Sequence, residues 1–286
     1  MFKKIYCFVV LMLTILVSVV SEASDGVQQI EGFNGSLLKF DGWDKKHGGW
    51  LSVEYKSEGG GFRLYDLPVV DPLPGFGIIA TSNAEALSPD KKIIMLQRTQ
   101  FGLVTNEQGQ EVNSEHTSCD ALSLVDGCIA YSGSAEKCSG VWMGDKWKVD
   151  GGDVLNLSAP PIPPRSLIGQ MSGSSPEERV DGLEAYMFMG VGSYMSCYPP
   201  ARNISEFNDI GFYFAQGGEH RIAMEVYRRL LKVAPDRIPL KLNVADSLWA
   251  LGQIDEAKSF YKSYNDAMFK KRGADKIPKR VSDRLK

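Results

Sequence analysis

The chain has 286 residues, a formal net charge of −3 and 43% hydrophobic residues. A chain of this length can bury a sizeable core and is long enough for two domains. Its mildly acidic balance gives no electrostatic reason to expect nucleic acid as the main partner.

The first 23 residues are typical of a secretory signal peptide. Lys3 and Lys4 precede an uncharged apolar run from Ile5 to Val20, and Ser21-Glu22-Ala23 follows it. A retained membrane anchor is the alternative, but the run of about 16 residues is shorter than the roughly 20 that span a bilayer. We therefore expect export across the inner membrane to the periplasm, cleavage near Ala23 and no membrane span afterwards.

An even number of cysteines lies beyond this segment: Cys119, Cys128, Cys138 and Cys197. In an exported chain this favours two disulfides, for which three connectivities are possible. Cys128 and Cys138 are symmetric about Gly133, so a hairpin centred there would place them opposite each other. That pair would leave a second bridge, Cys119–Cys197, between the two halves of the chain. The alternative, a zinc site that adds His116 to the first three cysteines, lacks close C-x-x-C pairs.

Residues 24–157 predict a β-rich domain. Short apolar or alternating runs are separated by glycine and proline, and they predict strands at 50–55, 62–65, 77–80, 93–96, 102–105, 121–125, 128–131 and 141–147. Frequent short strands with turn signals between them favour a mostly antiparallel domain, a sandwich or a partly open barrel.

One turn in this region has a recognisable sequence. The run from Ser88 to Lys92, S-P-D-K-K, resembles the S-P-D-G-K turn that opens a strand in many β-propeller blades, with Lys91 in the glycine position. Proline sets φ and aspartate binds the backbone ahead of it. About 130 residues would give only some three blades, too few to close a ring, so we expect one hairpin.

The sequence contains no complete motif for catalysis or for binding a metal or a cofactor. The sequence has no phosphate-binding loop of the Gly-Lys-Ser type, no H-E-x-x-H and no complete dinucleotide fingerprint. Four tryptophans suggest a carbohydrate-binding alternative in the β domain: Trp43, Trp50, Trp142 and Trp147. Tryptophans at strand ends more often pack in a core or at an edge. We expect His47 and His116 to lie on the surface or in loops.

A proline-rich boundary separates the two halves of the chain. Residues 158–174 predict a linker, because four prolines between Pro160 and Pro164 favour an extended segment. The helical domain is then expected to cover residues 175–286. Its first helix begins with Ser175 as N-cap and Glu178 completing a capping box, and it continues to about Val191.

The clearest pattern in the chain is an internal repeat of 34 residues. Five pairs of residues of matching size coincide at this shift: Gly211/Ala245, Phe214/Leu248, Gly218/Gly252, Ala223/Ala257 and Tyr227/Tyr261. Phe207, Ile210, Gly211 and Phe214 also lie on one helical face. Repeats of this length indicate stacked helical hairpins.

Residues 204–270 resemble the tetratricopeptide repeat (TPR) family. The first unit matches its small–large signature at Phe207, Ile210, Gly211, Phe214, Gly218, Ala223, Tyr227 and Pro235, and the second at Val244, Ala245, Leu248, Gly252, Ala257 and Tyr261. The second unit departs from the family pattern at Lys241 and Phe269, which suggests that the array ends there. We expect a basic final helix near residues 278–285, solvated as a cap or, alternatively, binding an acidic partner.

The TPR resemblance implies a concave groove, lined by the first helix of each hairpin, that binds a protein segment. By position, the groove would present Asn208, Phe212, Ala215, Leu242, Asp246 and Trp249. Trp249 is either a groove anchor or a residue packed under the final helix, and both alternatives stay open.

The expected fold class is therefore α+β and multidomain, an antiparallel β domain followed by a helical hairpin array. The expected function is that of an exported, non-enzymatic protein-binding protein without a cofactor or metal. One form of this function is an immunity-type protein that neutralises a secreted toxin. The alternatives are an envelope assembly factor, or an enzyme or carbohydrate-binding protein with its site in the β domain.

Overall fold

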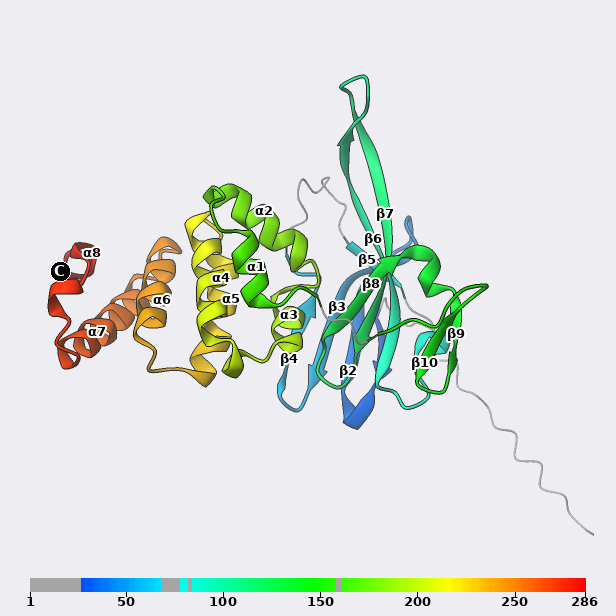
Figure 1. The fold of residues 1–286 in the computed structure, drawn as a ribbon, viewed down its shortest axis with the longest axis horizontal. Helices are drawn as coiled ribbons and strands as arrows, with labels where there is room; N and C mark the ends of the chain where they lie inside the picture. The colour runs from blue at the N-terminus through cyan, green and yellow to red at the C-terminus, as the bar shows by residue number, and fades with distance from the viewer. Residues whose placement is uncertain (1–26, 68–77, 82–83, 158–160) are drawn as a thin grey trace, which may run out of the picture.

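Antiparallel strands fill the first half of the chain and helices fill the second (Figure 1). The structure is a computed structural model that describes residues 27–67, 78–81, 84–157 and 161–286. The α+β class expected from the sequence is confirmed. The predicted signal peptide and the start of the predicted linker lie outside the described residues.

Most strands belong to one antiparallel sheet with the order β1-β2-β3-β5-β6-β7-β8, and β4 pairs with β3 beside that path. The strands are β1 (Val27–Glu31), β2 (Leu37–Asp44), β3 (Gly49–Ser57), β4 (Gly60–Leu64), β5 (Ile78–Thr81), β6 (Ile93–Thr105), β7 (Glu111–Ser123) and β8 (Ile129–Ser134). A second sheet pairs β9 (Gly140–Met143) with β10 (Lys146–Val149). In the described pairings the large sheet stays open, because β1 and β8 do not pair with each other.

The core of the β part comes from alternate residues that share one face of the sheet. Leu38 lies opposite Tyr55, and Phe40 lies opposite Val53, and all four side chains are buried. Such directly opposed apolar pairs are the unit of sheet stabilisation. The two predicted strands at 93–96 and 102–105 are parts of the single strand β6, which the intervening polar residues conceal in the sequence.

The predicted disulfide pairing is wrong. Cys119 is bonded to Cys138, and Cys128 is bonded to Cys197. No hairpin forms about Gly133, because β8 ends at Ser134 and a short 3-10 helix then carries Cys138 back over the sheet. A bridge between the two halves does exist, but it uses Cys128 in place of Cys119. The zinc alternative is wrong as well, because its three cysteines are all oxidised.

The helical part contains α1 (Pro164–Gln170), α2 (Pro176–Tyr186), α3 (Val191–Cys197), α4 (Ile204–Gln216), α5 (His220–Val233), α6 (Ile238–Ala250), α7 (Ile254–Lys270) and α8 (Lys279–Leu285). Short 3-10 helices occur at Phe33–Gly35, Ala84–Ala86, Ala135–Cys138, Pro200–Arg202 and Ala274–Lys276. No helix in the described ranges is long and apolar enough to cross a membrane.

The start of the helical part differs from the sequence expectation in two places. Helix α1 lies inside the predicted linker and buries Leu167, so the helical part begins at Pro164. The capping box at Ser175 is confirmed, but α2 ends at Tyr186. Gly190 interrupts the predicted helix with a φ of 92°, and a Cβ there would collide with the carboxyl group of Asp66.

Helix α3 joins the two halves by contacting both β4 and β8. Gly192 permits this approach, because a Cβ at that position would collide with the ring of Phe62. The amide of Ile129, at the start of β8, donates to the Ser193 hydroxyl at 2.9 Å, and the amide of Tyr65, just after β4, donates to the Met189 carbonyl at 3.0 Å. Helix α3, through Ser193, and the segment just before it, through Met189, therefore satisfy polar backbone groups at two strand ends.

The replacement of Cys128 and Cys197 together by alanine should lower the free energy of unfolding by about 4 kcal/mol, because this disulfide closes a long loop. The matched double variant at Cys119 and Cys138 removes a bridge with a sequence separation of 19 residues in place of 69. Its expected loss is only about 3 kcal/mol. Denaturant unfolding measures both values. An equal or smaller loss for the Cys128–Cys197 pair would show that the two halves do not share one unfolding transition.

Candidate protein-binding surface and domain junction

The 34-residue repeat corresponds to two helical hairpins of the same construction. Helices α6 and α7 each begin 34 residues after their counterparts α4 and α5. Gly211 of α4 leaves room for the ring of Tyr227, which a Cβ would strike, and Ala245 and Tyr261 occupy the corresponding positions in the second hairpin. The small residue on the first helix thus lets the second helix pack closely with a buried tyrosine.

The three predicted groove residues of α4 differ in exposure. Asn208 is buried and its side-chain carbonyl accepts a hydrogen bond from Asn243 of α6 at 3.2 Å, so it links the first helices of the two hairpins. Ala215 is partly buried, whereas the Phe212 side chain is 42% exposed. Phe212 is therefore the large apolar group that α4 offers to a partner.

The predicted groove residues of α6 are largely engaged by the chain's own last helix. Asp246 accepts hydrogen bonds from the Tyr261 hydroxyl at 2.6 Å and from Arg280 and Arg284 at 2.8 Å each. The guanidinium of Arg284 also lies 5.0 Å from the ring centre of Trp249. Trp249 thus packs beneath α8, which was one of its two alternatives, and Leu242 is partly buried.

Burial and the nearby carboxylate raise the pKa of the Tyr261 hydroxyl to about 12, so this group stays protonated and donates to Asp246. The hydrogen bond from Arg280 to Asp246 raises the pKa of that guanidinium in turn. One aspartate therefore fixes α8 against both helices of the second hairpin.

A buried ion pair that no sequence motif indicates lies where the helices meet the sheet. Nε of Arg98 in β6 donates to Asp120 in β7 at 2.7 Å, and both side chains are at most 4% exposed. The hydroxyls of Tyr65 and Ser132 also donate to Asp120, at 3.0 and 2.6 Å. Phe188, between α2 and α3, covers the Arg98 guanidinium at 4.4 Å from the ring centre. Burial, followed by the charge of Asp120, raises the pKa of Tyr65 far above its usual range.

A pair of carboxyl groups faces each other across the same junction. Asp66 follows β4 and Glu225 lies on α5, where Arg229 binds Glu225 at 3.3 Å. Burial and the facing Glu225 raise the pKa of Asp66 to about 7. One oxygen of Asp66 is buried without a hydrogen-bond partner. No local pattern could have predicted this pair, because its members lie on elements distant in the sequence.

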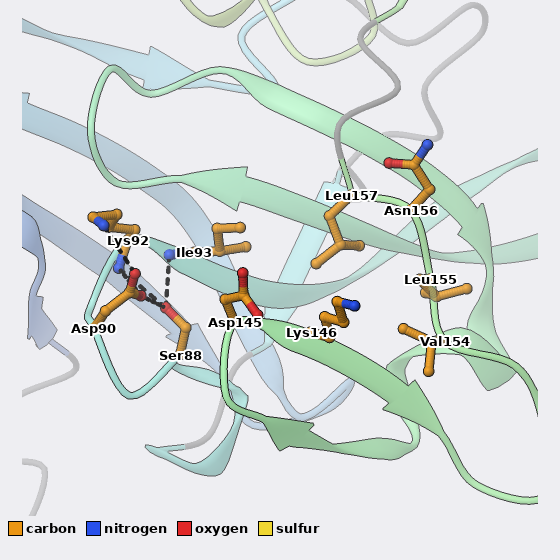
Figure 2. A pocket seen from close by; sticks show the side chains of 10 residues that line it. All are labelled: Ser88, Asp90, Lys92, Ile93, Asp145, Lys146, Val154, Leu155, Asn156 and Leu157. Atoms are coloured by element: carbon orange, nitrogen blue, oxygen red, sulfur yellow. Dashed lines mark hydrogen bonds and ion pairs between the residues drawn. The ribbon is translucent and has the colours of Figure 1, made fainter.

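A cleft of about 580 Å³ in the β part has a mixed lining (Figure 2). It lies among the turn at Ser88, the β9–β10 turn and residues 154–157. The Ser88 hydroxyl donates to Asp90 at 2.8 Å and accepts from the amides of Lys92 and Ile93, so the turn uses it fully. Lys91 adopts a φ of 58°, the conformation for which glycine is usual at this position. Ser88 is thus a turn residue. Its hydrogen bonds are those of a turn and not those of an activated nucleophile.

The tryptophans do not form a shared binding platform. Trp43 packs edge-on against Trp50 at 4.9 Å between ring centres, and Trp142 packs against Trp147 at 5.2 Å. The indoles of Trp142 and Trp147 donate to the carbonyls of Ala86 and Lys137. None of the four lines the cleft in Figure 2. The interpretation as core and edge packing is confirmed for Trp50 and Trp147, which are buried.

The histidines and acids do not assemble into a metal centre within the described part of the chain. His47 pairs with Asp44 at 2.6 Å, and His116 is exposed on β7. A scan against protein-family models and a search of curated proteins find no match for this chain.

The Asp66→Asn variant should have a different dependence of stability on pH from that of the natural protein. The folded-state pKa of Asp66, about 7, is above the ordinary aspartate value of about 3.9, so the folded protein binds the extra proton between these two pH values. This contribution to the free energy of unfolding is present below pH 4 and is lost as the pH rises through 7. Asparagine does not titrate, so the variant lacks this loss. Its free energy of unfolding relative to that of the natural protein should therefore rise by about 2 kcal/mol from pH 5 to pH 8.

Glu184 provides a matched control, because burial and Glu219 raise its pKa to about 7 as well. Denaturant unfolding at pH 5 and pH 8 of Asp66→Asn, Glu184→Gln and the double variant separates the two contributions. The account of the junction is contradicted if Asp66→Asn changes stability by the same amount at both pH values.

Proposed function

We propose that the protein is an exported protein-binding protein of the TPR family that holds a segment of its partner on the helical hairpins. The observation that carries this proposal is Phe212, a large apolar side chain exposed on the first helix of a 34-residue hairpin. The hairpins are rigidly built, because Tyr227 and Tyr261 are fully buried between their helices. An exposed aromatic residue on a rigid scaffold is typical of a binding hot spot.

The binding face on this proposal is the α4 side of the array. The α6 side is occupied by α8, whose Arg280 and Arg284 bind Asp246 and whose Arg284 also covers Trp249. Two hairpins alone offer a small face, so the neighbouring α2, which packs against α4, contributes to it. Tyr186 at the end of α2 is 42% exposed and adds a second aromatic group to the surface of the helical part.

Two features of the chain support a role outside the cytosol. Two disulfides within the described residues are consistent with an oxidising environment, where such bonds form and persist. The apolar run near the start of the sequence has the order of a secretory signal. An immunity-type role, in which the bound partner is a secreted toxin, is one form of this proposal.

The Phe212→Ala variant should bind its partner at least about tenfold more weakly, because truncation of a hot-spot aromatic costs about 2 kcal/mol or more of binding free energy. Val233, at the end of α5 in the same hairpin, is 43% exposed and provides a matched control. Tagged versions of both variants are used to isolate partners from the exporting cell, and affinities are then measured with the purified partner.

Val233→Ala should bind as the natural protein does. Trp249→Ala is unsuitable as a probe of binding, because it removes the surface on which Arg284 packs. If Phe212→Ala and Val233→Ala keep the same partner with equal affinity, the partner binds elsewhere and the proposed face is wrong.

A further inference from the structure

Helix α8 is attached to the second hairpin by few buried apolar groups. Arg280 lies 34 residues after Asp246, so α8 takes the position that the first helix of a third hairpin would have. It has seven residues and buries only Val281, whereas α6 has thirteen residues and buries five of them. A helix of this length is too short to be stable by itself in water. Its place at the end of the array therefore depends on its contacts with α6 and α7 (Figure 1).

The second hairpin offers α8 a site that binds arginine. We call it the arginine site, and it consists of Asp246, Trp249 and Tyr261. Nε and Nη2 of Arg280 donate to the two carboxylate oxygens of Asp246, at 3.1 and 2.8 Å. Nη1 of Arg284 donates to the same carboxylate at 2.8 Å. The guanidinium of Arg284 also lies 5.0 and 5.5 Å from the ring centres of Trp249 and Tyr261. One carboxylate and two aromatic rings thus hold two guanidinium groups.

The arginine site takes its shape from the hairpin alone. Asp246 and Trp249 lie on α6, and Tyr261 lies on α7. The Tyr261 hydroxyl donates to Asp246 at 2.6 Å, and the rings of Trp249 and Tyr261 pack edge-on with 6.3 Å between their centres. These contacts involve no residue of α8. The carboxylate and the rings therefore keep their arrangement when α8 is absent, and Asp246 then lacks the cations that neutralise it.

The contacts of α8 define the kind of segment that this site recognises. A guanidinium is planar, so it can donate two hydrogen bonds to one carboxylate and stack on aromatic rings, whereas the ammonium group of lysine is a point charge. Arg280 uses the first property and Arg284 the second. Val281 is fully buried beside them, and Leu285 is partly buried. The recognised segment thus has two arginines four residues apart, each followed by an aliphatic residue.

The polar contacts that hold α8 are open to solvent. The side chains of Arg280, Arg284 and Asp246 are 45%, 27% and 28% exposed. Ion pairs at such positions contribute little to stability, because water and salt screen them. Elements with few buried groups open locally at a free energy well below that of global unfolding. Residues 271–278 join α8 to α7, so α8 can leave the site while the hairpin stays folded.

We propose that α8 is a latch over the arginine site, and that a segment of a partner protein with the pattern arginine-aliphatic-x-x-arginine-aliphatic displaces it. This occupant is inferred from complementarity, because the chain's own residues 280–285 have the same pattern and make every contact that the site offers. The opened site adds the α6 side of the array to the Phe212 face. The proposal goes beyond that face and does not depend on it, because none of its contacts involves Phe212.

A labelled peptide with the sequence of residues 277–286 is the probe, and fluorescence anisotropy measures its dissociation constant. The unlatched variant (Arg280→Gln, Arg284→Gln) should bind the peptide at least about tenfold more tightly than the natural protein, because the internal segment no longer competes for the site. The further change Asp246→Asn should remove this gain. A peptide with lysine in place of both arginines should bind the unlatched variant at least about tenfold more weakly.

A control variant (Arg221→Gln, Arg228→Gln) removes two exposed arginines of α5, so it changes the net charge as much as the unlatched variant does. It should bind the peptide as the natural protein does. Circular dichroism checks that every variant is folded. In the natural protein, an excess of the arginine peptide should speed hydrogen exchange of the α8 amides, and the lysine peptide should not.

The proposal is overturned if the unlatched variant binds the peptide no more tightly than the natural protein, or if the control variant gains the same affinity. It is overturned equally if the arginine peptide leaves the exchange of α8 unchanged. Sedimentation of the natural protein at twice the 31.6 kDa of one chain, with return to one chain on addition of the peptide, would assign the site to α8 of a second copy and would also overturn it.

Discussion

The contact of helix α3 with strands β4 and β8 is the constraint on which the rest of the structure depends. Every residue from Val191 to Met195 in this helix is buried. The helix can approach the sheet only because Gly192 has no side chain to strike Phe62. Ser193 and the Met189 carbonyl then accept strand-end amides, and the Cys128–Cys197 disulfide fixes the end of the helix to β8. Because these contacts combine packing, hydrogen bonds and a covalent bond at one place, the helical array has one defined position on the sheet.

The surfaces available to partners follow from this position and from the helix that closes the array. Asp246 holds α8 against the second hairpin, so the predicted anchor Trp249 is covered by the chain itself. The first hairpin keeps Phe212 exposed, and β6 and β7 extend beyond the sheet as a tall hairpin (Figure 1). The buried Arg98–Asp120 pair at the junction has its hydrogen bonds satisfied, so it serves the structure of the interface. Helix α8 thus covers Trp249 and leaves Phe212 as the exposed aromatic side chain of the first helices of the two hairpins.

The sequence predicts most of what depends on local patterns. The repeat can be recognised in the sequence because close helix packing requires a small residue at Gly211 where the ring of Tyr227 packs. The capping box at Ser175 can be recognised because its hydrogen bonds join residues that are close in the sequence. The disulfide pairing could not be predicted, because it depends on where β8 ends and on the 3-10 helix before Cys138. The sequence left two alternatives for Trp249, and the choice between them depends on how α8 folds back on the second hairpin. The junction charges come from elements distant in the sequence, and no spacing rule connects them.

Native-state hydrogen exchange tests the central claim, that α3 makes the sheet and the helices one cooperative unit. Two amides report on it directly: that of Tyr65, bound to Met189, and that of Ile129, bound to Ser193. The account predicts that both, together with the amides of α3, exchange with the same opening free energy as the central strands β2 and β3. Exchange of these amides at a clearly lower free energy, with the central strands still protected, would contradict it.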